Sequence, residues 1–191
     1  MMKIRIPFIL AVLCLIVRVA HASSIGVFFA PDGSDCDGVA APLTPFNIYI
    51  GAVLGGDTAA AGMAGAEFSL AGADPAWLTT ITPNPAANLT IGSPVTGGCN
   101  IAFPVCQPGP FVPLYTIQFI SPVAIPPSTF TIRRHFNQSA PSLPCPLFAV
   151  CDASFTKLCV TGGQAFLNDP TRACAVGVEQ RSWAAVKSIF R

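Results

Sequence analysis

"GMAGAEFSLA", residues 62–71, places an apolar side chain at every second position around Glu67 and Ser69. The alternating apolar residues are Ala66, Phe68 and Leu70. Side chains of a β-strand point alternately to its two faces, so this stretch predicts a strand with one apolar and one polar face. The apolar face packs on a core in this interpretation, and Glu67 and Ser69 point outward.

Other short stretches alternate in the same way and are separated by linkers rich in Pro and Gly. They are 24–30, 46–54, 87–92, 100–105, 114–120, 129–135, 155–161 and 164–168. About nine short strands separated by turns predict an all-β fold, a two-sheet antiparallel β-sandwich of jelly-roll or immunoglobulin-like type. Pro104 and Pro113 lack the N–H that a sheet ladder needs, so we expect them at an edge, an end or a bulge.

The first 22 residues have the layout of a secretory signal peptide. Lys3 and Arg5 precede an apolar run over 6–17, and Ala20-His21-Ala22 provides a small-x-small cleavage motif. The run is too short to span a bilayer. We therefore expect a signal peptide over 1–22, a β-sandwich domain over 23–176 and a tail over 177–191. The expected location is secreted, extracellular or at the cell surface, and the periplasm remains possible.

Charge is scarce in this sequence. Charged residues make up 10% of the chain, against the ~25% that is usual for soluble domains. All nine acidic residues but only seven of the ten basic residues follow residue 22. Without a basic surplus to neutralise phosphates, nucleic acid is excluded as an expected partner. No run after the leader is long and apolar enough to span a membrane.

Seven cysteines remain once Cys14 leaves with the leader. In a secreted chain they predict disulfides, and the absence of any CxxC motif argues against zinc. The candidates are Cys36, Cys99, Cys106, Cys145, Cys151, Cys159 and Cys174. If 100–105 is extended, Cys99 and Cys106 lie about 23 Å apart and cannot pair with each other. Pro146 bends the chain between Cys145 and Cys151, so we predict that these two pair across a local loop.

Candidate site residues each have two interpretations. Asp32, Asp35 and Asp37 suit calcium, although their spacing is not that of an EF-hand and a solvated turn is the alternative. No other cofactor is expected. Trp77, Tyr49 and Tyr115 form either an aromatic sugar platform or part of the core. A hydrolase would need His135 as its base, but there is no GxSxG motif and we expect no catalytic residue.

The tail has a different pattern. Trp183, Val186 and Phe190 follow a possible cap, Ser182, at helical spacing. This predicts a short C-terminal amphipathic helix, which either packs on the sandwich or acts as a docking or export tag.

The longer stretch "GMAGAEFSLAGADPAWLTTITPN" (62–84) resembles cohesin-like domains. It combines a GxxG stretch of small residues, alternating apolar residues, the turn Asp74-Pro75, and then Trp77 and Leu78. "GPFVPLYTIQF" (109–119) and "VTGGQAFLN" (160–168) are similar to later strands of that family. Carbohydrate-binding modules share the general architecture.

The resemblance implies a nine-stranded jelly-roll-like sandwich that binds partners on a flat sheet face. It also implies that the first and last strands run side by side in parallel. Cys36 and Cys174 each lie six residues beyond one of these strands, so they are expected to pair. One of Cys99, Cys106 and Cys159 is then free or intermolecular.

The expected function is a secreted or surface-exposed, non-catalytic structural or binding module for protein–protein adhesion or scaffolding. The alternative is a carbohydrate-binding accessory domain, and a hydrolase built on His135 is the third hypothesis. The expected partner is an extracellular protein or polysaccharide.

Overall fold

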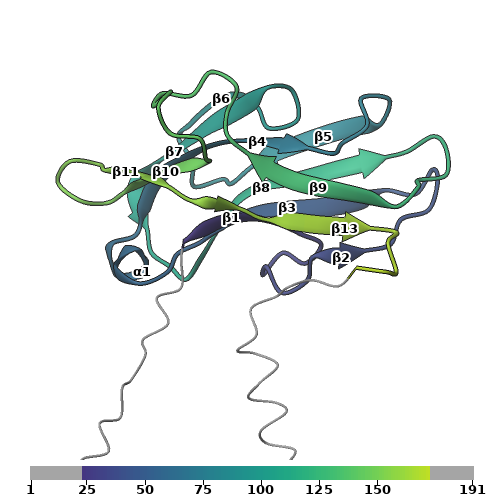
Figure 1. Ribbon diagram of the computed structural model, residues 1–191, viewed down its shortest axis with the longest axis horizontal. Helices are drawn as coiled ribbons and strands as arrows, with labels where there is room; N and C mark the ends of the chain where they lie inside the picture. Colours follow the sequence, from purple (N-terminus) through teal and green to yellow (C-terminus); the bar gives the residue numbers. More distant parts are fainter. Residues whose placement is uncertain (1–22, 173–191) are drawn as a thin grey trace, which may run out of the picture.

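A computed structural model describes residues 23–172, which form two β-sheets packed face to face (Figure 1). The first sheet has the order β12-β1-β3-β8-β5. The second has the order β11-β10-β4-β9-β13-β2, and β7 joins β6 to the other edge of β4. The elements are β1 (Ser24–Phe28), β2 (Asp37–Gly38), β3 (Phe46–Val53), α1 (Asp57–Ala61), β4 (Met63–Ala71), β5 (Leu78–Pro83), β6 (Leu89–Ser93), β7 (Gly98–Gln107), β8 (Phe111–Ile120), β9 (Ser128–Arg133), β10 (Leu147–Val150), β11 (Lys157–Cys159), β12 (Thr161–Gly162) and β13 (Gln164–Leu167).

Every stretch predicted to be a strand contains one, so the predicted β-sandwich is confirmed. The alternation failed to reveal β2, β5, β10 and the five-residue helix α1. Strand β5 is mostly exposed on the edge of the first sheet, so it carries no apolar stripe. Strand β10 is only four residues long and three of them are buried, which leaves no alternation to detect.

The last strand changes sheets, and this adds parallel pairs to the predicted antiparallel arrangement. Strand β12 pairs in parallel with β1, as the resemblance implied, whereas β13 pairs with β9 in the second sheet. The chain passes from one sheet to the other at Gly163. The N–H of Gly163 donates to Ile25 O in the first sheet, and its carbonyl accepts from Ile132 N in the second. A Cβ on the neighbouring Gly162 would lie 2.1 Å from Ile132 O, so only glycine allows this approach.

The core between the sheets is aromatic at its centre. Phe119 of β8 stacks on Phe130 of β9 with ring centroids 5.8 Å apart, and Trp77 packs edge-on against both rings. Pro113 lies where the register between β3 and β8 shifts, which confirms the predicted bulge. Pro104 lies where β7 loses its regular register with β4.

Several expectations fall outside the described residues. They are the signal peptide over 1–22, the domain boundary at 176, the tail residues Trp183, Val186 and Phe190, and Cys174. Within residues 23–172, no helix has the length and apolar character needed to cross a membrane.

Candidate functional site

The candidate site is the outer face of the second sheet, the face that points away from the core. Cross-strand pairing sets Leu89 of β6 opposite Ala102 of β7, and Ala102 opposite Gly65 of β4. The next outward row runs from Ile91 through Asn100 to Glu67. Opposed residues share a face, and their neighbours Ile101 and Phe68 are buried in the core.

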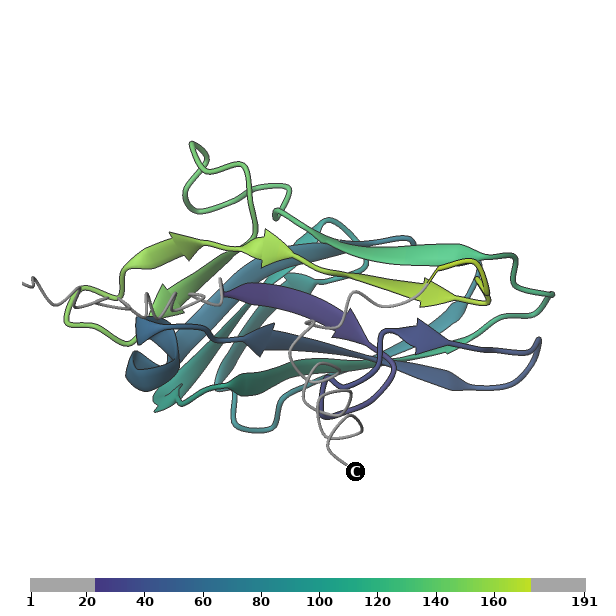
Figure 2. The same ribbon diagram turned by 60° about the horizontal axis from the view of Figure 1, so that its bottom comes forward.

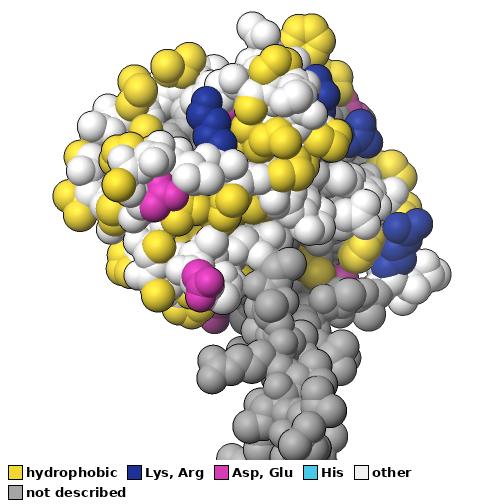
Figure 3. All heavy atoms as spheres, turned by 60° about the vertical axis from the view of Figure 1, so that its left-hand side comes forward, with side chains coloured by type: hydrophobic (Ala, Val, Ile, Leu, Met, Phe, Trp, Pro, Cys, Tyr) yellow, Lys and Arg dark blue, Asp and Glu magenta, His cyan; other side chains and the backbone are white. Residues whose placement is uncertain are grey.

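The open half of this face comprises the outward residues of β6 and β7. Leu89 is 50% exposed and Ile91 is 56% exposed. Neither β6 nor β7 contains a charged residue. Figure 3, which brings the left-hand side of Figure 1 forward, shows hydrophobic side chains spread over the surface among scattered acidic and basic ones. The open half is therefore flat, apolar and almost uncharged.

The covered half comprises the outward residues of β4 and β10, including Glu67 and Leu147. Strands β9 and β10 pair with successive parts of the same edge of β4. Between them, residues 134–146 leave the sheet and rise above its outer face (Figure 2). We call these residues the cover segment. Beneath it Leu147 is only 2% exposed, although it points outward.

Glu67 points outward as predicted, yet it is buried. It is 6% exposed because the cover segment lies over it. Its carboxylate accepts hydrogen bonds from Ser139 N at 2.7 Å and Ser139 Oγ at 2.6 Å. A buried carboxylate is costly without such donors. Two further hydrogen bonds fix the segment. Ser69 Oγ donates to Arg134 O, and Phe136 N donates to Gly97 O.

The structure brings His135, Ser139 and Glu67 together, but without the geometry of a catalytic triad. Ser139 Oγ donates to Glu67 and accepts from Lys157 Nζ, so its proton points at the carboxylate. His135 Nδ1 accepts from Asn137 N at 2.9 Å and lies 3.9 Å from Glu67 Oε1. The His135 side chain is 15% exposed rather than solvated, because its ring packs against Gly98. The cluster holds the cover segment in place.

Two disulfides hold β10 at its ends. Cys106 pairs with Cys151, and Cys145 pairs with Cys159. The predicted Cys145–Cys151 pair was wrong: residues 147–150 form an extended strand rather than a closed loop, and each of these cysteines pairs with a different partner. The separation of Cys99 from Cys106 along β7 is confirmed.

Cys99 is the free cysteine among the described residues and lies in the core. Burial raises the pKa of its thiol to about 12. A thiol with so high a pKa is inert at neutral pH, so Cys99 is not a nucleophile.

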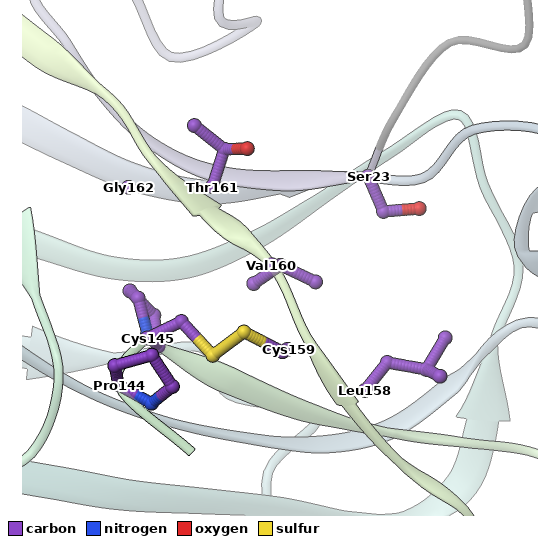
Figure 4. A pocket seen from close by; sticks show the side chains of 9 residues that line it. Ser23, Pro144, Cys145, Leu158, Cys159, Val160, Thr161 and Gly162 are labelled. Carbon is purple, nitrogen blue, oxygen red and sulfur yellow. A yellow bond between two sulfur atoms is a disulfide. The ribbon is translucent and has the colours of Figure 1, made fainter.

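A hollow of about 550 Å³ adjoins the Cys145–Cys159 disulfide (Figure 4). Ser23, Pro144, Leu158 and Thr161 are among the residues that line it, and no acidic or basic side chain takes part. It therefore offers no general acid or base for hydrolysis.

The core interpretation holds for two of the three aromatic residues that were considered for a sugar platform. Trp77 and Tyr115 are 8% and 4% exposed, so both belong to the core. A stacking platform requires exposed aromatic faces, and these two cannot supply them.

The aspartates of the 32–38 loop bond within their own loop. Asp32 accepts from Ser34 N and Oγ, and the side-chain bond from Ser34 holds the pKa of Asp32 below its usual value. Asp35 accepts from Asp37 N. Within residues 23–172 no three His, Cys, Asp or Glu side chains are grouped to hold a metal ion. Calcium binding here stays a prediction.

Comparison with known proteins gives matches at the level of structure. No protein-family model matches the chain, and no curated protein matches its sequence. The cohesin module of a family 33 glycoside hydrolase from Clostridium perfringens superposes with a TM-score of 0.52 at 12% identity, covering 78% of this chain and 95% of that chain.

Two further cohesins superpose with a TM-score of 0.50. The sixth cohesin of Acetivibrio cellulolyticus scaffoldin B, solved in complex with a Cel5 dockerin, is 10% identical over 77% of this chain and 98% of its own. The OlpA cohesin of Clostridium thermocellum, solved in complex with Doc918, is 8% identical over 76% of this chain and 99% of its own. The chain therefore has a cohesin-like β-sandwich fold, as the 62–84 stretch predicted.

Proposed function

We propose that this chain is a non-catalytic protein-binding module of a secreted or surface-exposed protein, and that its partner docks on the open half of the outer face. The observation that carries the proposal is the exposure of Leu89 and Ile91 on a flat, uncharged sheet surface. Protein interfaces are depleted of charge at their centre, where apolar side chains are desolvated.

The backbone keeps this face flat. A Cβ on Gly65, at the centre of the sheet, would lie 2.6 Å from Ile101 O, so no larger residue fits there. Gly65 pairs with Ala102 of β7, and Ala102 pairs in turn with Leu89 of β6, which is half exposed. A partner can therefore approach the sheet closely beside two apolar anchors.

The structural comparisons and the bonding of Ser139 support this proposal over the carbohydrate-binding and hydrolase hypotheses. Two of the structures with this fold were solved bound to a protein partner. The buried Trp77 and Tyr115 weaken the carbohydrate alternative, and Ser139 is bonded as an anchor rather than as a nucleophile. Two disulfides agree with the oxidising compartment that the leader predicts.

The test is a partner screen followed by a measured affinity. The mature chain captures proteins from the extracellular and surface fractions of its source cell, and each captured protein is purified and titrated by calorimetry. Leu89→Arg places a charge in the proposed interface and should weaken binding at least tenfold. Val123→Arg is the matched control, because Val123 is 63% exposed in the loop between β8 and β9. Equal affinity of Leu89→Arg and wild type would show that the partner docks elsewhere.

A further inference from the structure

The first sheet also has an outer face, and one row of side chains crosses four of its strands. Cross-strand pairing sets Thr82 of β5 opposite Thr116 of β8. Tyr49 of β3 lies opposite Thr116, and Phe28 of β1 lies opposite Tyr49. Opposed residues share a face, and this row points away from the core because Ile50, the next residue of β3, is buried.

A second row, made of polar side chains, lies beside the Tyr49 row. Thr80 of β5 lies opposite Gln118 of β8, and Gln118 lies opposite Asn47 of β3. Gln118 Nε2 donates to Asn47 Oδ1 at 3.3 Å. Such an amide pair still has an N–H donor on Asn47 and a carbonyl acceptor on Gln118 to offer to a ligand.

Aromatic rings lie on the other side of the Tyr49 row. Gly26 of β1 is paired with Gly51 of β3. A Cβ on Gly26 would collide with the Phe28 ring, and a Cβ on Gly51 would collide with the Phe111 ring. Because neither glycine has a side chain, both rings lie close against the sheet, edge to face with centroids 5.6 Å apart. Both are partly exposed, so the face presents aromatic surface next to its polar groups.

The strands of the first sheet carry no charge. None of its five strands contains Asp, Glu, Lys, Arg or His. Residues 75–132, which include all of β5 and β8, contain none either. A charged ligand would lose hydration on this face without gaining a counter-charge. The ligand that fits is therefore neutral and polar.

We propose that the outer face of the first sheet binds a neutral polysaccharide. A sugar unit carries hydroxyl groups around its rim and apolar C–H groups on its ring faces. Tyr49 stacks on a ring face, and Asn47 and Gln118 bond the hydroxyl groups. The row from Thr82 to Phe28 spans about 14 Å at the usual strand spacing. It is longer than one sugar ring, so it suits consecutive units of a chain.

This binding goes beyond the protein-binding function proposed for the second sheet and does not rest on it. The two outer faces lie on opposite sides of the sandwich, so one chain can hold a polysaccharide and a protein at once. Trp77 and Tyr115 take no part, because both are buried in the core.

Affinity electrophoresis of the mature chain tests the binding, and it needs no protein partner. Native gels contain xylan, galactomannan, mixed-linkage β-glucan or soluble starch, and cellulose and chitin are tested by co-sedimentation. We expect at least one of these neutral polysaccharides to retain the chain. Retention by none of them, or stronger retention by the acidic polysaccharide polygalacturonate, would overturn the proposal.

Substitutions then test the place of binding. Tyr49→Ala should weaken retention about tenfold through the lost stacking contact, whereas Tyr49→Phe keeps the ring and should retain most of the binding. Gln118 is exposed, so Gln118→Ala leaves the core intact; the loss of one hydrogen bond should weaken binding about fivefold.

Gln164→Ala is the matched control and should bind like wild type. Gln164 is also an exposed strand glutamine whose amide bonds a neighbouring strand, at Thr131 Oγ1, but it belongs to β13 in the second sheet. Wild-type retention of both Tyr49→Ala and Gln118→Ala would show that the polysaccharide does not bind this face.

Discussion

The open and covered halves of the outer face belong to one sheet and differ in what lies above them. Leu89 and Leu147 are the same residue type on the same face, yet their exposures are 50% and 2%. The difference comes from the cover segment, residues 134–146, which lies over Glu67 and Leu147 and leaves β6 uncovered. The direction in which a strand residue points is therefore a local property, whereas its burial depends on a segment elsewhere in the chain.

The covered half is held by specific bonds, and the open half is held only by the sheet itself. Ser139 supplies two hydrogen bonds to Glu67, and Gln138 Nε2 donates to Cys145 O within the segment. Cys145, near the end of the cover segment, is fastened to β11 through Cys159. Changes in the covered half should therefore affect stability, and changes in the open half should affect binding.

The two disulfides provide the largest expected effect. Replacing Cys106 and Cys151 by alanine opens a loop of 45 residues, and replacing Cys145 and Cys159 opens one of 14. Loop-closure entropy predicts losses of about 4 and about 3 kcal/mol in the free energy of unfolding. Urea unfolding of the two double variants measures both. A larger loss from the shorter loop would show that the bond to the cover segment contributes more than chain entropy.

The second-largest effect is expected from the two leucines of the outer face, Leu147 and Leu89. Leu147→Ala should lower the free energy of unfolding by about 3 kcal/mol, because it leaves a cavity beneath the cover segment. Leu89→Ala should change it by less than about 0.5 kcal/mol, because the side chain is already half exposed. Both are measured by urea denaturation, and similar losses at the two positions would remove the distinction between the halves.

Ser139→Ala should have the smallest effect of the three. It removes one hydrogen bond to a buried carboxylate, at a cost of about 2 kcal/mol, and it should speed amide hydrogen exchange across residues 135–139. Ser128→Ala serves as the control, since its hydroxyl bonds Pro126 O at the exposed start of β9. If both variants leave stability and exchange unchanged, Glu67 does not hold the cover segment.

The strand pattern was predictable because alternation is imposed by the geometry of each strand. Phe130 and Ile132 are buried as their spacing predicts, and Pro113 marks a bulge because it lacks an N–H. Strand β5 escaped prediction because an exposed edge strand needs no apolar stripe. The cohesin-like fold was also predictable, from the small residues, the alternation and the Asp74-Pro75 turn of the 62–84 stretch.

The sequence by itself determined which residues alternate, and hence the two-layer β-sandwich and its aromatic core. Only the tertiary structure decided that Glu67 is buried, because the donors that satisfy it lie 72 residues away at Ser139. It also decided that Cys106 meets Cys151 and Cys145 meets Cys159. A disulfide requires Cα atoms within about 7 Å, and that distance is set by which strands become neighbours.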